Sequence, residues 1–243
     1  MIAKHISDAV KFDELRDSVC APILPLRELI GVSRACGLRH DVDLDTSRAL
    51  TLARIEYALG VRSTYFFLHS ADYFDASSFG DICKEISGYG HEIGLHNDAL
   101  VDSYKTRIPV EDILSQALSR LRGFGVEVVG TSAHGCSETY SKGLYNYGVW
   151  SEFDPNKNEG APSTLQYPLD KFGLKYEAYF TNYSFYLTDS GSHWSGIQIK
   201  GKKPYERELY TNTCYAGRTI LSEFNSADKC ILQILTHPTY WQM

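Results

Sequence analysis

The chain has 243 residues, and its 43 % of hydrophobic residues together with 19 glycines are typical of a packed globular protein and exclude a disordered one. Because 24 basic residues stand against 30 acidic ones, the net charge of −6 argues against a nucleic-acid partner. The length suits one large hydrophobic core, and no linker, internal repeat or low-complexity segment divides it. We therefore expect a single domain over residues 1–243.

The chain carries no sequence signal for export or for a membrane. Charges are scattered through the first 20 residues, without the apolar stretch that a signal peptide needs. No apolar run approaches the ~18–20 residues that span a bilayer. The six cysteines lie far apart without a C-x-x-C pair, as expected for separate thiols in a reducing compartment. We expect a cytoplasmic protein, and the sequence leaves its oligomeric state open.

Apolar runs alternate with helical patterns along the first half of the chain. Strands are predicted over 35–38, 63–68, 92–95 and 126–133. Helices are predicted between them, from Asp45 or Thr46 to Leu59, from Ser77 or Ser78 to Gly88, and from Pro109 to Gly123. Each of these helices ends at one or two glycines, which readily adopt the conformation that terminates a helix.

The second half of the chain is less regular. Residues 143–168 predict long loops around a strand over 147–150. Further strands are predicted over 185–187, 197–199 and 230–235, with a helix over 218–225 before the last of them. The alternation predicts a parallel sheet covered by helices, either a barrel or a doubly wound sheet, and we favour a β/α barrel with up to eight units.

Active sites in parallel α/β proteins lie beyond the carboxyl ends of the strands. In this chain those positions hold charged residues and histidines, namely Arg39, His40, Asp41, Asp43, His69, His96, Asp98, His134, Asp189 and His237. A single histidine at such a position is most often structural. Histidines at four strand ends, with two aspartates at the first, indicate a functional site.

The segment D-V-D at 41–43 points to a metal ion. Residues two apart in an extended segment project to the same side, so Asp41 and Asp43 would repel one another in a dry pocket. A cation removes this repulsion, and aspartate with two histidines suits a divalent ion such as Zn²⁺ with an open position for water. The alternative is an Asp-rich turn that caps the next helix, a task that Asp45 or Thr46 could perform alone.

Four segments carry a resemblance to a known family. They are G-L-R-H-D-V-D at 37–43, G-H-E-I-G-L-H at 90–96, S-A-H-G at 132–135 and L-T-H-P at 235–238. With them the chain resembles the NodB-homology polysaccharide deacetylases, carbohydrate esterase family 4, from about residue 35 to 240. The resemblance implies a distorted parallel (β/α) barrel of about seven strands, a divalent metal, and hydrolysis of N-acetyl groups on sugars.

The same resemblance implies roles for four residues. Asp41 resembles the family's general base and Asp43 its metal-binding aspartate, while His96 resembles the first metal histidine and His237 the general acid. The second metal histidine of the family would fall at position 100, where this chain has Leu100.

The departure at position 100 calls for another ligand, and a further family motif is missing. The expected replacement for the missing ligand is His134, with Asp98 and His69 as further candidates. The family's arginine-containing third motif is also absent around 130–140.

Other residues are candidates for substrate binding or orientation. Arg39 or His40 could orient Asp41, and His69 stands at the end of the second strand. Asp189 could hold His237 through a hydrogen bond, although we favour a turn before Ser190. Trp194, like several aromatic residues near these positions, could stack on a sugar, although core packing is the favoured interpretation for each of them.

These observations predict a metal-dependent N-deacetylase that acts on a carbohydrate, in the biosynthesis of a surface polysaccharide. Zn²⁺ is the expected cofactor, with Co²⁺, Mn²⁺, Fe²⁺ and Ni²⁺ as alternatives. A deformylase or a small-amide hydrolase on the same barrel is an alternative activity. Because of Leu100, a metal-free carbohydrate-binding protein is another.

Overall fold

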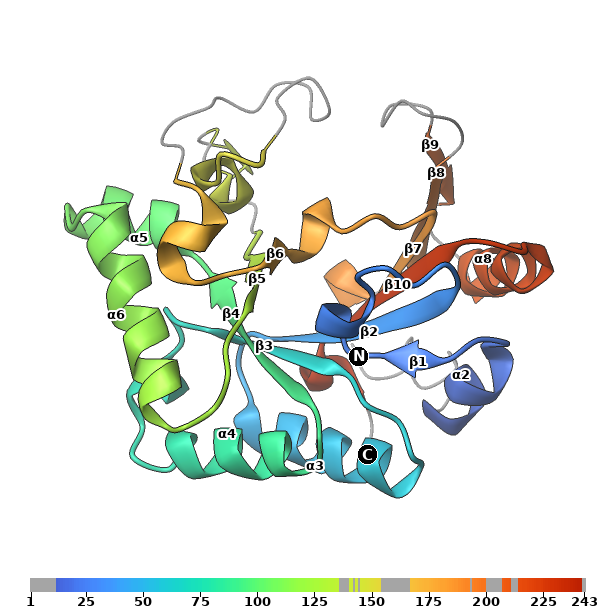
Figure 1. Cartoon of the computed structure of the whole chain (residues 1–243), viewed down its shortest axis with the longest axis horizontal. Helices are drawn as coiled ribbons and strands as arrows, with labels where there is room; N and C mark the ends of the chain where they lie inside the picture. The colour runs from blue at the N-terminus through green and yellow to red at the C-terminus, as the bar shows by residue number, and fades with distance from the viewer. Residues whose placement is uncertain are drawn as a thin grey trace.

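The computed structural model describes residues 12–135, 140, 141, 143, 145–153, 167–192, 194–199, 207–210 and 214–241. One ten-stranded sheet forms its centre, in the order β6-β5-β4-β3-β2-β10-β7-β8-β9, with β1 paired to β2 (Figure 1). The strands are β1 (Ile23–Leu24), β2 (Ala35–Val42), β3 (Thr64–Leu68), β4 (Glu92–Asn97), β5 (Gly130–Ala133), β6 (Tyr176–Glu177), β7 (Phe185–Thr188), β8 (Ser195–Ile199), β9 (Arg207–Tyr210) and β10 (Ile231–Thr236). The helices are α2 (Phe12–Ser18), α3 (Thr46–Ala58), α4 (Phe79–Gly88), α5 (Ala99–Thr106), α6 (Val110–Gly123) and α8 (Cys214–Ser226).

The sheet is mostly parallel and curls into a half-barrel. All neighbours along the path from β6 through β5, β4, β3, β2 and β10 to β7 pair in parallel. Strands β8 and β9 extend the sheet beyond β7 in antiparallel pairing. Among the described residues nothing pairs β6 with β9, so the barrel is open there. The predicted parallel (β/α) barrel is confirmed, with seven strands in its parallel part.

The register of the central strands places their carboxyl ends at one edge. All eight residues of β2 are buried, as expected for a parallel strand covered on both faces. Thr236 of β10 pairs with His40 of β2, and His96 of β4 pairs with both Leu68 of β3 and Ser132 of β5. The residues that follow these strands therefore share one end of the half-barrel.

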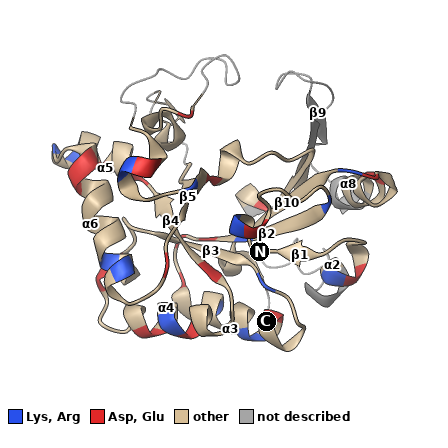
Figure 2. Ribbon diagram, viewed as in Figure 1, with Lys and Arg blue, Asp and Glu red and all other residues tan. Residues whose placement is uncertain are grey.

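Helices cover the outer face of the sheet (Figure 1). Helix α3 begins where predicted, because the Asp45 carboxylate accepts hydrogen bonds from the backbone amides of Ser47 and Arg48. Helices α4 and α6 bury their apolar faces in one hydrophobic cluster with β3 and β4, whereas α8 packs with β7 and β10 in a second. Lys, Arg, Asp and Glu are mixed along the outer helices (Figure 2). No helix in the described part of the chain is long and apolar enough to cross a membrane.

Two predicted elements differ from the structure, and one helix was not predicted. Residues 147–150 do not form a strand: Asn146–Val149 is a 3₁₀ helix, and only Trp150 makes a bridge, to Tyr167. Their apolar side chains serve tertiary packing, since Val149 and Trp150 are fully buried in the first cluster. The fourth strand starts at Gly130 instead of residue 126, and α5 was not predicted. Within the predicted loops of 143–168, residues 144 and 154–166 lie outside the described residues.

Four cysteines in the described part of the chain are free thiols, as predicted: Cys20, Cys36, Cys83 and Cys230. Burial raises the pKa of the Cys36 and Cys83 thiols, which keeps these two thiols protonated. Cys136 and the side chain of Cys214 lie outside the described residues.

Candidate active site

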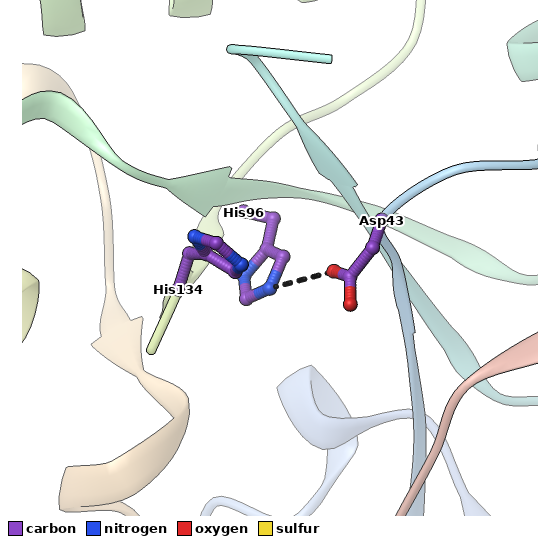
Figure 3. A group of neighbouring side chains, drawn as sticks. All are labelled: Asp43, His96 and His134. Atoms are coloured by element: carbon purple, nitrogen blue, oxygen red, sulfur yellow. Dashed lines mark ion pairs between the residues drawn. The ribbon is translucent and has the colours of Figure 1, made fainter. Parts of the chain in front are cut away.

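Three strand ends bring Asp43, His96 and His134 together. Asp43 follows β2, His96 is on β4, and His134 follows β5 (Figure 3). One potential ligand atom of each residue lies within 4.8 Å of those of the other two. Nε2 of His96 is 3.3 Å from Oδ1 of Asp43, and the two imidazole rings lie edge to face with centroids 5.2 Å apart. The structure thus brings together the three residues predicted as metal ligands.

A small residue two positions before His96 makes room beneath it. Side chains two apart on a strand share a face, so Gly94 and His96 both face the barrel interior. A Cβ atom at Gly94 would lie only 2.3 Å from the ring of Phe66, which fills this space. The Phe66 ring belongs to a small apolar cluster with Leu26 and Tyr176.

The buried His96 is oriented by its backbone contact and by two carboxylates. Its Nδ1 lies 2.9 Å from the carbonyl oxygen of Ser132, to which it can donate, and this leaves Nε2 facing Asp41 and Asp43. Burial acts to lower the pKa of His96, but the charges of Asp41 and Asp43 outweigh it and raise that pKa to about 9. In the absence of a cation, a proton on Nε2 therefore offsets part of the charge of the two carboxylates.

Asp43 has an oxygen atom suited to a cation. Burial acts to raise its pKa, but contact with His96 and the charges of His96, His237 and His134 lower it overall. Its Oδ1 is buried and accepts no hydrogen bond of good geometry from the described residues. One carboxylate oxygen and two imidazole nitrogens fit Zn²⁺ and similar divalent ions. Ligand atoms bonded at ~2.1 Å in a tetrahedral site lie about 3.4 Å apart. The present separations of up to 4.8 Å would therefore have to shrink by only about 1 Å, through small side-chain rotations, to complete the coordination.

Asp41 faces the same interior beside Arg39. Only 2 % of Asp41 is exposed, and its Oδ2 accepts a hydrogen bond of 3.3 Å from Ser132 Oγ and lies 3.8 Å from Arg39 Nη2. Arg39 is fully buried, donates to the same Ser132 hydroxyl at 2.8 Å, and packs over the Tyr179 ring. Its guanidinium and Ser132 hold one oxygen of Asp41, while Oδ1 is left without a partner among the described residues.

His40 points away from Asp41, because side chains alternate along β2. Its Nε2 lies 2.7 Å from Glu56 of α3, and its Nδ1 lies 2.6 Å from Thr236 of β10. Glu56 also accepts hydrogen bonds from Ser63 and Tyr65 in this fully buried network. Of the two residues expected to orient Asp41, only Arg39 is placed to do so.

Asp189 lies beside His237. Its Oδ1 is 2.6 Å from Nδ1 of His237, and its Oδ2 accepts the backbone amide of the same residue at 3.0 Å. Burial lowers the pKa of His237, but the hydrogen bond and the charge of Asp189 raise it above its ordinary value. The turn that we favoured for Asp189 is made by Thr188, whose hydroxyl accepts the amide of Ser190. Nε2 of His237 lies 3.9 Å from Oδ2 of Asp43, which connects this pair to the site.

His69 is engaged by the backbone of Asp98, and Trp194 packs in the core, the interpretation that we favoured for it. Nε2 of His69 accepts the backbone amide of Asp98 at 2.9 Å, so that nitrogen is not free for a metal. Burial lowers the pKa of His69 to about 4, which keeps the ring neutral. Trp194 is 7 % exposed and packs edge to face against Trp241 in the second hydrophobic cluster, where little of its surface is left for a sugar.

The sequence did not point to Glu177, which lies behind the site. This fully buried carboxylate is the second residue of β6, a strand too short to leave a pattern, and it accepts the backbone amide of Ala133 next to His134. Burial raises its pKa to about 7, although the amides of Tyr179 and Ala133 and the charge of Arg39 act to lower it.

No protein-family model matches the chain, and no curated protein matches it in sequence. Several solved structures are similar to it. They include a polysaccharide deacetylase from Bacillus cereus (15 % identity, 84 % of this chain and 79 % of that one, TM-score 0.45). A CE4 esterase from Streptococcus mutans is 12 % identical over 87 % of this chain and 77 % of the other, with a TM-score of 0.49. A CE4 family pseudoenzyme from Bacillus anthracis is 10 % identical over 86 % of this chain and 56 % of its own length, with a TM-score of 0.42.

Proposed function

We propose that this protein is a metal-dependent hydrolase that removes N-acetyl groups from a carbohydrate, as a divergent member of carbohydrate esterase family 4. The observation that carries this proposal is the convergence of Asp43, His96 and His134 within 4.8 Å of one another. Two further groups border that point, Asp41 beside His96 and His237 beside Asp43. A metal centre flanked by a carboxylate and an imidazole has the groups that amide hydrolysis requires.

Asp43, His96 and His134 would hold the metal ion. Zn²⁺ fits their donor atoms best, and Co²⁺, Mn²⁺, Fe²⁺ and Ni²⁺ are alternatives. A divalent cation, when bound, polarises the amide carbonyl and makes water more acidic.

Asp41 is the proposed general base. Arg39 and Ser132 hold its Oδ2, so the carboxylate is fixed in place. Its Oδ1 is buried without a hydrogen-bond partner among the described residues and is the atom that can take the proton from an attacking water molecule.

His237 is the proposed general acid. Its Nδ1 is held by the buried Asp189, and its raised pKa favours the imidazolium form. Nε2 faces Asp43 and is the atom from which a proton passes to the departing amine nitrogen. The site thus places a carboxylate and an imidazole, the groups that can serve as base and acid, on either side of the proposed metal ion.

The test combines metal analysis with assays of hydrolysis. Protein purified without chelator is expected to carry about one equivalent of a divalent metal and to deacetylate N-acetylated sugars. Asp41→Asn is expected to keep the metal and to lose turnover by roughly 10²–10⁴-fold, whereas Asp43→Ala loses both metal and turnover.

Other results would redirect or overturn the proposal. Faster hydrolysis of N-formyl sugars or of small amides would replace the substrate assignment. A metal content below about a tenth of an equivalent, with no rise in melting temperature on addition of Zn²⁺, Co²⁺ or Mn²⁺, would favour a metal-free carbohydrate-binding protein. A fully active Asp41→Asn variant would refute the assignment of the base.

A further inference from the structure

The carboxylate of Asp98 lies behind His134, on the far side of the ring from the metal centre. Its Oδ1 is 3.3 Å from Nδ1 of His134, a buried nitrogen that has no hydrogen-bond partner among the described residues. Figure 3 shows one ring nitrogen of His134 turned toward His96 and the other turned away. Because Nδ1 lies at Asp98, the nitrogen that faces His96 is Nε2.

Asp98 is itself held firmly in this position. Its Oδ1 accepts a hydrogen bond of 2.9 Å from the side-chain amide of Asn146, and its Oδ2 accepts one of 3.2 Å from Ser70. The same Asn146 amide nitrogen lies 2.8 Å from the carbonyl oxygen of His134. The backbone amide of His134 donates to the carbonyl of Asn97 at 2.8 Å. With its oxygens engaged in this way and only 6 % of the residue exposed, Asp98 is not placed to be a ligand itself.

We propose that Asp98 is a positioning residue for the metal: it accepts the proton of His134 Nδ1 and so keeps the Nε2 lone pair free for the cation. This inference rests on the proposed metal-dependent function. His96 has an equivalent arrangement, since its Nδ1 faces the carbonyl oxygen of Ser132. Metal-binding histidines are commonly fixed in one tautomer by an acceptor at the other ring nitrogen.

The same arrangement explains how the chain can have a leucine at position 100, where the family has a metal-binding histidine. At that position the side chain packs in the first hydrophobic cluster, and its backbone amide donates to Asn146 at 3.0 Å. Asn146 therefore links the start of α5 to both Asp98 and His134. The ligand that is missing at position 100 is replaced from the next strand end, together with a carboxylate that orients it.

One structural role open to Asp98 is to cap α5, which it precedes. Its side chain makes no hydrogen bond to the first turn of that helix within the described part of the chain. The Asp98 backbone amide is occupied by His69. The main partner that remains for the carboxylate, besides Asn146 and Ser70, is His134.

Metal affinity provides the first test, with the Kd for Zn²⁺ measured by competition with a chelator. Asp98→Ala is expected to raise the Kd by roughly 10–100-fold. Asp98→Asn is expected to raise it less, because its amide oxygen can still accept from Nδ1. Asp102→Asn is the matched control: this carboxylate lies on α5 but 3.4 Å from His69, and its loss should leave the Kd unchanged.

The tautomer of His134 provides a second test that a structural role would not affect. In long-range ¹H–¹⁵N spectra of the metal-free protein, His134 is expected to carry its proton on Nδ1, and Asp98→Ala is expected to shift it toward Nε2. His96 is the internal control, since its Nδ1 acceptor is a backbone carbonyl.

The possible outcomes separate the two proposals. If the wild-type protein binds Zn²⁺ and Asp98→Ala binds it equally well with an unchanged His134 tautomer, the role of Asp98 is refuted while the proposed function stands. If the wild-type protein binds no metal, the proposed function fails and takes this inference with it. If Asp98→Ala does not fold, Asp98→Leu decides, because leucine fills the space and has no acceptor: a Kd and a tautomer equal to those of the wild type would refute the role.

Discussion

The free energy of unfolding of Glu177→Gln, measured relative to that of the wild type, should increase as the pH rises. Glu177 is fully buried, and one of its oxygens accepts two backbone amides while the other has no partner among the described residues. Glutamine has the same shape and keeps one oxygen for the two amides. The substitution therefore removes the ionisation and leaves the hydrogen bonds at Oε1 in place.

The magnitude follows from the pKa of Glu177, which burial raises from 4.5 to about 7. Between these two values the native state binds the proton more tightly than the unfolded chain, so the wild type loses stability as the pH rises. A difference of 2.5 pKa units corresponds to about 3.4 kcal/mol in total, of which about 2.5 kcal/mol falls between pH 5 and pH 8. The stability of Glu177→Gln relative to the wild type should rise by that amount across this range.

Urea unfolding of both proteins at pH 5, 6, 7 and 8 measures this difference. Other titrating groups are the same in both proteins, so their contributions cancel when the free energies of unfolding are subtracted. A difference between the two proteins that stays constant within about 0.5 kcal/mol from pH 5 to pH 8 would refute the reasoning.

Three other changes probe the site and its support. Asp189→Asn should lower the pKa of His237, because it weakens the hydrogen bond and removes the charge that raise this pKa. The alkaline limb of the pH profile of kcat/KM should then move to lower pH, and an unmoved limb would contradict this prediction. Because the pKa of His96 is about 9, Co²⁺ must displace a proton, and its apparent Kd should fall about tenfold per pH unit between pH 6.5 and 8. A Kd independent of pH would exclude this competition. Glu56→Ala leaves His40 and the other buried partners of Glu56 without their acceptor, and it should lower the free energy of unfolding by about 3–5 kcal/mol. A loss below about 1 kcal/mol in urea unfolding would show that this buried network does not stabilise the fold.

Much of the fold could be predicted from local patterns. Buried runs such as that of β2 alternate with helices that begin at a capping residue like Asp45 and end at glycine. Short elements such as β6 could not be predicted, because two residues carry no periodicity. The run at 147–150 was misassigned, because an apolar run predicts burial in a core as well as it predicts a strand.

For the candidate site, the residue types and their positions at strand ends were visible in the sequence, but their partners were not. Asp189 and His237 are 48 residues apart, and their contact depends on the pairing of β7 with β10. Arg39 and His40 are neighbours with equal claims in the sequence, and the alternation of β2 sends one to Asp41 and the other to Glu56.

What the sequence by itself determined is the parallel sheet and the set of strand ends that carry aspartate and histidine, because both follow from the order and spacing of residues along the chain. Which of those side chains meet was decided only by the tertiary structure. The register between β2, β4 and β5 brings Asp43, His96 and His134 together, and the packing of side chains sends His69 and Trp194 elsewhere. Contacts of this kind depend on three-dimensional distances and side-chain directions, which local sequence patterns do not encode.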